Sequence, residues 1–297
     1  VASAGNTARS FARVCSDNNI PLLLSVPEDN ISSLWFDKPI KDNVKLIVSK
    51  KGSDYFDAIH LSQLACKLDG FIPEGGAKNV ARRDGMGTTT LSAATTIGKI
   101  PDYYFQAVGS GTGAIAAWEA NLRLINDGRF GYNKMKLMVS QNMPFVPLKH
   151  AWQKRSRQLL PLEDHTARKQ VEEIFAKVLS NRKPPYSLTG GLYDAMVDAG
   201  GDVLTAKNEE ALAANQLFEK TEGIDLHPAA AIATATLINA AKNKEIDPDA
   251  TIMLNITGGG ENKFKKDKKL HYLKPSLIFD YNPEFIDVKE KLQKLFA

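Results

Sequence analysis

Short apolar runs alternate along the chain with longer stretches in which apolar residues recur every three or four positions. The runs predict strands at residues 21–26, 44–48, 103–108, 136–140, 202–204 and 251–256. The longer stretches predict helices at residues 7–19, 54–68, 112–126, 167–179, 209–220 and 228–241. Because the runs are short, rich in branched residues and without polar alternation, we expect strands that are buried on both faces. Strands alternating with helices predict an α/β fold built on mostly parallel sheets flanked by helices.

Two parts follow one another in this pattern. Residues 1–97 are predicted to form a smaller domain that ends in the glycine-rich stretch "PEGGAKNVARRDGMG". Residues 98–297 are predicted to form a larger domain around "GSGTG", with an extended tail from His271 and a last amphipathic helix. We therefore expect two domains, each with its own sheet.

Composition excludes several classes of protein. The two cysteines, Cys15 and Cys66, lie far apart and outside any CxxC or zinc spacing, so no metal site or disulfide framework is indicated. No apolar run reaches about 18 residues, and the first residues lack the pattern of a secretory signal. The net charge of +4 is too small and too dispersed to indicate nucleic acid, and the "KFKKDKK" run (263–269) is predicted to be a solvated loop. The cytoplasm is the expected location.

The stretch "VGSGTGAIAAWEA" is the clearest candidate site. Its glycine-rich loop directly follows a predicted strand and precedes a helix, and consists of Gly109, Ser110, Gly111, Thr112 and Gly113. Glycines let the backbone approach a ligand, and the unpaired N–H groups at the start of a helix attract anions. The loop therefore predicts a phosphate cradle, with a tight turn that binds nothing as the alternative.

Three other loops carry polar groups next to predicted helices or strand ends. Ser3, Asn6 and Thr7 precede or open the first helix, where Asn6 or Thr7 could equally serve as an ordinary helix cap. Thr257 follows the last predicted strand and precedes three glycines, at the kind of strand end where α/β sheets bind ligands, with an ordinary turn residue as the alternative. Arg82 lies in "NVARRDGMG", where an arginine suits phosphate, sulfonate or carboxylate groups, and a solvated helix start is the alternative. No GxSxG or HExxH motif supports a triad hydrolase or a zinc peptidase.

Together these loops resemble the fold type II pyridoxal-phosphate enzymes, the tryptophan synthase β group. "SAGNT" is similar to the family's asparagine loop, "NVARRDGMG" to its N-x-x-R-x-x-G stretch and "VGSGTG" to its phosphate loop. "EGIDLHPAAAIATATL" and "NITGGG" are similar to its late helix and to its closing glycine-rich strand end. Within the group the chain resembles the threonine synthases and, more closely, the archaeal cysteate synthases, over nearly its whole length.

The resemblance implies a cofactor, pyridoxal 5'-phosphate, and a role for each loop. Asn6 would bond the ring oxygen of the cofactor, the residues of the 109–113 loop would cradle its phosphate, and Thr257 would face its pyridine nitrogen. An uncharged hydroxyl at that nitrogen favours β-replacement. The implied reaction converts O-phospho-L-serine and sulfite to L-cysteate and phosphate, on the route to coenzyme M.

The substrate contacts follow from the same resemblance. Ser3 and Thr7, together with loop N–H groups, would hold the substrate carboxylate, and Arg82 would grip its phosphate. Arg9, one turn into the first helix, is a further candidate for sulfite or phosphate, or a plain surface residue. The resemblance also implies small-molecule substrates and a homodimer, with neither nucleic acid nor membrane as partner.

The chain departs from the family pattern at several positions. Ala4 replaces the second serine of the asparagine loop, and His227 replaces an acidic residue before the proline of the late helix. Gly76 and Ala77 stand where threonine synthases tend to have Asn and Ser, which counts against threonine synthase.

The Schiff-base lysine of the family lies upstream of the asparagine loop, and no lysine precedes Asn6 in this sequence. We therefore expect an inactive, N-terminally truncated fragment with no catalytic residue of its own. The alternatives are a threonine synthase that acts on O-phosphohomoserine and a non-catalytic domain that binds a small anion or a partner.

Overall fold

The computed structural model describes residues 1–3 and 5–295 of the chain, and it divides into two compact units. Unit 1 comprises Val1–Glu74 and Lys263–Ala297, and unit 2 comprises Gly75–Asn262. These bounds differ from a division after residue 97. The helix that precedes residue 98 packs in unit 2, and the tail returns to the sheet of unit 1.

Unit 1 is built on a parallel sheet. Its elements are α1 (Asn6–Asp17), β1 (Leu22–Pro27), η1 (Glu28–Ser33), β2 (Trp35–Phe36), β3 (Val44–Ser49), α2 (Tyr55–Ala65), β8 (His271–Tyr272), β9 (Leu277–Phe279) and α11 (Phe285–Gln293). The strand order is β1-β3-β9, and both pairings are parallel. The first residues extend this sheet, because Ala2 forms a parallel bridge with Ser25 of β1.

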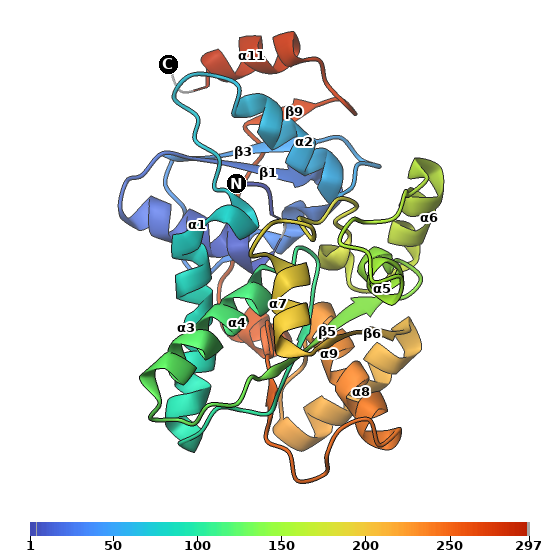
Figure 1. The fold of residues 1–297 in the computed structure, drawn as a ribbon. Coiled ribbons are helices and arrows are strands. Elements are labelled where there is room, and N and C mark those ends of the chain that lie inside the picture. The colour runs from blue at the N-terminus through green and yellow to red at the C-terminus, as the bar shows by residue number, and fades with distance from the viewer. Residues whose placement is uncertain (4, 296–297) are drawn as a thin grey trace. The chain divides into compact units, whose positions relative to one another are not determined.

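Both faces of this sheet are covered, as the unbroken apolar runs predict. Alternate residues of β1 and β3, such as Leu24 and Leu46, pack with α1 residues in one buried cluster. The intervening Ile47 packs with α2 and α11 in another, together with Phe279 of β9. Because successive side chains of a strand point to opposite faces, a strand with helices on both sides is apolar at every position. Figure 1 labels β1, β3 and β9 beside α2 and α11.

Unit 2 holds the larger sheet. Its strands are β4 (Tyr103–Ala107), β5 (Lys136–Asn142), β6 (Asp202–Ala206) and β7 (Ile252–Leu254). Its helices are η2 (Gly76–Lys78), α3 (Val80–Ile97), α4 (Thr112–Asp127), α5 (Pro147–Gln153), α6 (Asp164–Glu173), η3 (Lys177–Leu179), α7 (Leu192–Ala199), α8 (Asn208–Glu222) and α9 (Pro228–Lys242). A further helix, α10 (Glu261–Asp267), begins as unit 2 ends.

The chain changes its direction of travel across this sheet once. The order is β6-β5-β4-β7, all parallel, so the chain moves outward from β4 through β5 to β6 and then returns to the other side of β4. Helices α4 and α7 contact β5, and α9 packs against β4, β5 and β6. The space between the carboxyl ends of β4 and β7 is thus a topological switch point, where open α/β sheets bind ligands.

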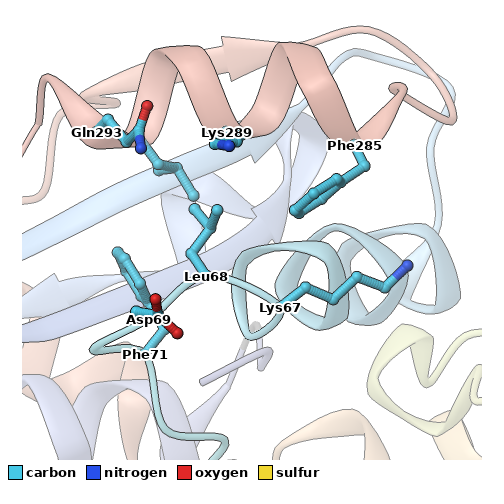
Figure 2. Close-up of a pocket in the computed structure, with 8 residues that line it drawn as sticks. Lys67, Leu68, Asp69, Phe71, Phe285, Lys289 and Gln293 are labelled. Carbon is cyan, nitrogen blue, oxygen red and sulfur yellow. The ribbon is translucent and has the colours of Figure 1, made fainter.

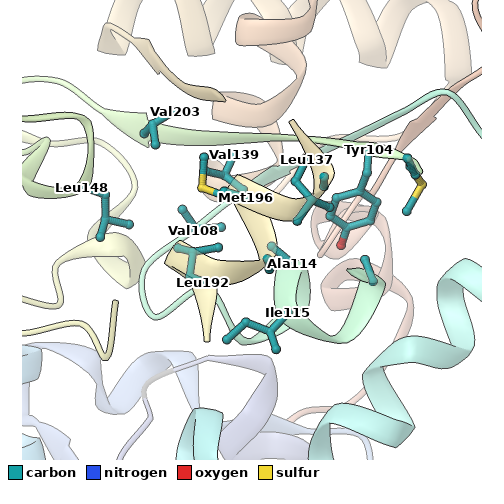
Figure 3. Packing of buried hydrophobic residues seen from close by; sticks show 14 of the residues in the cluster. Tyr104, Val108, Ala114, Ile115, Leu137, Val139, Leu148, Leu192, Met196 and Val203 are labelled. Atoms are coloured by element: carbon teal, nitrogen blue, oxygen red, sulfur yellow. The ribbon is translucent and has the colours of Figure 1, made fainter. Parts of the chain in front are cut away.

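A continuous core fixes this sheet against α4 and α7. It includes Tyr104, Leu137 and Val139 from the strands and Ile115 and Leu192 from the helices, all fully buried (Figure 3). α3 joins this layer by packing on α4 at close range. A Cβ atom at Gly87 of α3 would lie 3.2 Å from the carbonyl oxygen of Ala116, so the small residue allows the approach.

Two predicted segments differ from the structure. The helix predicted at 167–179 begins at Asp164 and ends at Glu173. It ends there because the side-chain oxygens of Asn208 and Asn142 accept the N–H groups of Phe175 and Ala176, which a continuing helix would use itself. Residues 263–267 of the predicted basic loop belong to α10 instead. None of the described helices is long and apolar enough to cross a membrane.

Candidate functional site

The glycine-rich loop of unit 2 ends β4 and opens α4. Gly111 is the N-cap residue of α4, with a φ angle of 80°, a left-handed conformation that favours glycine. The first turn of α4 contains no acidic residue, and in the described part of the chain no side chain caps it. The N–H groups and the dipole of this helix end therefore favour an anion, as the loop sequence predicts.

Two hydroxyl groups lie within this loop. The Ser110 Oγ and Thr112 Oγ1 atoms are 2.9 Å apart and share a hydrogen bond. Thr112 is buried, whereas Ser110 is half-buried. A hydroxyl can donate one bond and accept others, so the pair can orient a donor toward a bound oxygen.

A chain of hydrogen-bonded polar side chains, two of them buried and one half-buried, lies next to the loop. The Nδ2 atom of Asn255 donates to the Tyr104 hydroxyl at 2.7 Å, and that hydroxyl donates to Oε1 of Gln106 at 2.8 Å. A Cβ atom at Gly113 would lie 2.5 Å from both terminal atoms of the Gln106 side chain. A side chain at this position would therefore require the Gln106 amide to move.

Burial also keeps the Tyr104 hydroxyl uncharged. Tyr104 is fully buried, and loss of water around it raises its pKa far above the ordinary value for tyrosine. The hydroxyl therefore stays protonated and able to donate. Sequence reasoning missed Gln106, although a glutamine inside the apolar run "YYFQAV" is itself a signal of a buried polar contact.

A second segment lies against the first glycine of the loop. A Cβ atom at Gly109 would be 3.3 Å from the carbonyl oxygen of Val178. Val178 belongs to a segment, residues 178–182, that also contains three buried polar residues: Ser180, Asn181 and Arg182. Arg182 is only 7% exposed and forms an ion pair with Asp164. The sequence did not single out these residues, because their burial arises only when the 178–182 segment meets the loop.

Thr257 follows the strand that neighbours β4. Phe105 of β4 is in register with Leu254 of β7, and the Asn255 N–H donates to the Phe105 carbonyl at 2.9 Å. Gly109 and Thr257 therefore follow two adjacent parallel strands at the same edge of the sheet. The sheet thus brings two of the predicted cofactor-binding segments to its switch point.

The connection between α8 and α9 holds the glycines after Thr257. The His227 N–H donates to the Gly258 carbonyl at 2.9 Å, and the Gly260 N–H donates to the Asp225 carbonyl at 2.8 Å. His227 is also the N-cap of α9, since its Nδ1 atom accepts the Ala229 N–H at 3.4 Å. An imidazole thus caps this helix.

The two adjacent arginines of "NVARRDGMG" have different surroundings. Asn79 caps α3 by accepting the Arg82 N–H at 3.1 Å, which places Arg82 in the first turn. The Nε atom of Arg83 donates to both carboxylate oxygens of Glu119 at 2.9 and 3.1 Å, and its Nη1 atom donates to the Ala77 carbonyl at 2.5 Å. Arg83 therefore helps to pack α3 on α4.

The remaining predicted residues belong to unit 1. Asn6 is the first residue of α1 and is exposed, while Ser3, Thr7 and Arg9 are half-buried. The N-cap is Gly5 and makes no side-chain cap, so neither Asn6 nor Thr7 is the helix cap that the alternative interpretation proposed. Ala4, the departure from the family loop, lies outside the described residues.

An open depression of about 370 Å³ lies at the start of α1. Its lining includes Asn6, Arg9 and Arg13 from α1 and Trp35 from β2. The guanidinium carbon of Arg9 lies 3.8 Å from the centroid of the Trp35 ring, and Arg9 Nη2 donates to Asn6 Oδ1. Sequence reasoning did not select Trp35, which lies far from Asn6 along the chain and carries no motif.

A different cavity of unit 1, of about 540 Å³, lies between α2 and α11. Phe285 and Lys289 of α11 line it together with Lys67 and Leu68 after α2 (Figure 2). It includes none of the predicted site residues. Among the described residues, no group of three His, Cys, Asp or Glu side chains could hold a metal ion.

Residues 1–258 match the family described as pyridoxal-phosphate dependent enzyme. The chain therefore belongs to this family, and it is an enzyme chain that uses pyridoxal phosphate.

Among its curated relatives are cysteate synthases. The chain is 50% identical over 285 residues to that of Methanosarcina acetivorans, covering 96% of this chain and 68% of the relative. It is 50% identical over 276 residues to that of Methanosarcina barkeri, covering 93% and 66%. The chain thus spans about two thirds of the length of these relatives.

Solved structures share the fold at low sequence identity. A pyridoxal 5'-phosphate-dependent aspartate racemase matches with a TM-score of 0.60 at 14% identity, over 86% of this chain and 71% of the other. Maize serine racemase matches with a TM-score of 0.61 at 12% identity, over 89% of this chain and 74% of the other. The fold is accordingly the fold type II architecture of pyridoxal-phosphate enzymes, as the sequence predicts.

Proposed function

We propose that the complete protein is a cysteate synthase, which replaces the phosphate of O-phospho-L-serine with sulfite and releases L-cysteate. The observation that carries the proposal is the switch point of unit 2. There the 109–113 loop, which leads into α4, and Thr257 follow adjacent strands. Relatives that are about half identical to the chain are named for this activity.

The loop fits the phosphate of the cofactor. Its glycines keep the backbone accessible, the α4 terminus contributes N–H groups, and Ser110 and Thr112 contribute hydroxyls. When bound, pyridoxal phosphate supplies an electron sink that stabilises negative charge at the substrate Cα atom. Thr257 would offer an uncharged hydroxyl to the ring nitrogen, which moderates that sink and suits replacement at Cβ.

Other residues have proposed contacts by resemblance. Asn6 would donate to the phenolic oxygen of the cofactor, and Ser3 and Thr7 would hold the substrate carboxylate. Arg82 would bind the phosphate of the substrate, and Arg9 would be a second anion contact. We assign neither the lysine that carries the cofactor nor the base that removes the Cα proton, because no lysine precedes Asn6 in this sequence.

Threonine synthase is the alternative within the same family. Gly76 has a positive φ angle of 56°, and Ala77 is 3% exposed, at the positions where threonine synthases tend to have Asn and Ser. A buried methyl group offers no hydrogen bond to a substrate phosphate, so these positions favour the cysteate synthase proposal.

The test is phosphate release by the protein expressed from its complete reading frame. We expect release from O-phosphoserine to require sulfite and to yield cysteate in equal amount. Faster turnover of O-phosphohomoserine, with threonine as product, would replace the proposal with threonine synthase. No release from either substrate would reject both.

By the same resemblance, we propose that the complete protein is a homodimer in the cytoplasm, with neither nucleic acid nor membrane as partner. Sedimentation at micromolar concentration would reveal a monomer if the dimer is wrong.

A further inference from the structure

A row of three side chains links the proposed cofactor contact to an aromatic ring. Arg9 Nη2 donates to Asn6 Oδ1, from one turn further along α1. The same guanidinium lies against Trp35, 3.8 Å from the ring centroid, and all three residues belong to unit 1. Asn6 and Arg9 line the same open depression.

This contact decides which way the Asn6 amide faces. A guanidinium has only donors, so the atom of Asn6 that meets it must be the carbonyl oxygen. The amide NH₂ group is then fixed on the opposite branch. The reverse orientation would bring two donors together and lose the bond.

Trp35 holds the guanidinium in this position. The indole is anchored in β2, which pairs antiparallel with β8 through Trp35 and Tyr272. Phe264 packs against the indole at a centroid distance of 5.4 Å, and Lys265 Nζ lies 5.3 Å from the ring centroid. A planar guanidinium can stack on such a ring and still donate from its edge, which an ammonium cannot do equally well.

We propose that Arg9 is a positioning residue for the cofactor: held against Trp35, it fixes the Asn6 amide with its NH₂ group facing away from the guanidinium, in the orientation that would donate to the phenolic oxygen of pyridoxal phosphate. The inference rests on the proposed role of Asn6. It gives Arg9 a function in cofactor binding that needs no direct contact with sulfite or phosphate. If Asn6 donates to that oxygen, the positive charge of Arg9 would lie one side chain away and would favour its deprotonated form.

The experiment measures the cofactor alone, in the complete protein without substrate. Arg9→Met removes the donor and should raise the dissociation constant of pyridoxal phosphate by about twofold to tenfold, the value of one hydrogen bond. It should also increase the fraction of bound cofactor that absorbs at shorter wavelength, because the deprotonated oxygen loses support. Arg9→Lys keeps a cationic donor and should restore part of both properties.

Arg13→Met is the matched control. Arg13 lies one turn further along α1 and lines the same depression, but it donates to Asp17 and to the carbonyls of Lys38 and Pro39. Its substitution should change neither the dissociation constant nor the spectrum. Equal effects of the two methionine variants would overturn the inference, since a general loss of charge would then explain them. Far-ultraviolet circular dichroism establishes that each variant is folded.

Asn6→Ala separates this inference from the proposed function. If that substitution leaves cofactor binding unchanged, the proposed role of Asn6 fails. If it weakens binding but Arg9→Met does not, only the positioning role fails. If both weaken binding, the double variant should be no weaker than Asn6→Ala alone, and an additive loss would show that Arg9 acts without Asn6.

Discussion

The closeness of Gln106 to Gly113 predicts that Gly113→Ala destabilises the protein, whereas helix propensity alone would predict stabilisation. Gly113 is the second residue of α4, and replacing a helical glycine with alanine ordinarily stabilises a helix by about 0.5–1 kcal/mol. Here the added Cβ would lie 2.5 Å from the Gln106 amide, which is 7% exposed and bonded to Tyr104. The amide must therefore move for alanine to fit.

The expected cost exceeds the gain. Overpacking of a well-packed interior costs about 1–3 kcal/mol, and loss of the bond between Tyr104 and Gln106 costs about 1 kcal/mol more. After subtraction of the helix propensity, we expect Gly113→Ala to lower the free energy of unfolding by about 2 kcal/mol. Urea-induced unfolding followed by circular dichroism measures this change.

Gly85→Ala is the control for propensity. Gly85 lies in α3 and is exposed, and no atom lies within 4 Å of the position that an added Cβ would take. Its substitution should therefore stabilise the protein by about 0.5–1 kcal/mol. Adding Gln106→Ala to Gly113→Ala should relieve the clash and give a coupling energy of about 1 kcal/mol or more. If Gly113→Ala and Gly85→Ala change the free energy of unfolding equally, or if Gly113→Ala and Gln106→Ala show no coupling energy, the reasoning about the Gln106 contact is refuted.

Two further predictions concern charged side chains of unit 2. Arg83→Met should lower the free energy of unfolding by about 1–2 kcal/mol, because it removes both bonds to Glu119, and urea unfolding with no measurable loss would contradict that role. The hydrogen bonds from Arg157 at 2.6 and 2.7 Å hold the pKa of Asp194 below its ordinary value of 3.8. A lowered carboxyl pKa stabilises the folded state at pH values above the ordinary pKa, and this stabilisation is lost as the pH falls through the folded-state pKa. Asp194→Asn should therefore lower the free energy of unfolding by about 1 kcal/mol at pH 7 and by progressively less at acid pH. A cost independent of pH, in unfolding curves from pH 7 down to pH 2.5, would show that the charge of Asp194 is not its source.

Local patterns predicted most elements because each pattern has a local cause. The runs at 44–48 and 103–108 form strands as predicted, and they carry apolar residues on both faces because helices cover both faces of their sheets. The segment 167–179 was predicted wrongly, since its pattern suits a helix to the end. Side chains of Asn142 and Asn208, distant in sequence, take the N–H groups on which the helix would depend.

The candidate site likewise contains residues that local motifs identify and residues that only the packing reveals. Glycines and hydroxyls next to strand ends identify the 109–113 loop and Thr257, because the chemistry of a helix terminus is local. Gln106 beneath Gly113 and Trp35 against Arg9 carry no motif, and their relevance follows only from packing. Likewise, only the structure shows that Arg83 is the arginine of this stretch that bonds Glu119.

The sequence by itself determined the family, the parallel α/β architecture and the loops suited to a phosphate and an anionic substrate. It could do so because motif residues, the spacing of apolar positions and the chemistry of a helix terminus are all visible in neighbouring residues. Only the tertiary structure decided that β7 returns beside β4, that the tail joins β3, and that Arg9 meets Trp35. Those pairings depend on the burial and hydrogen bonding of segments far apart in the chain, which no local pattern encodes.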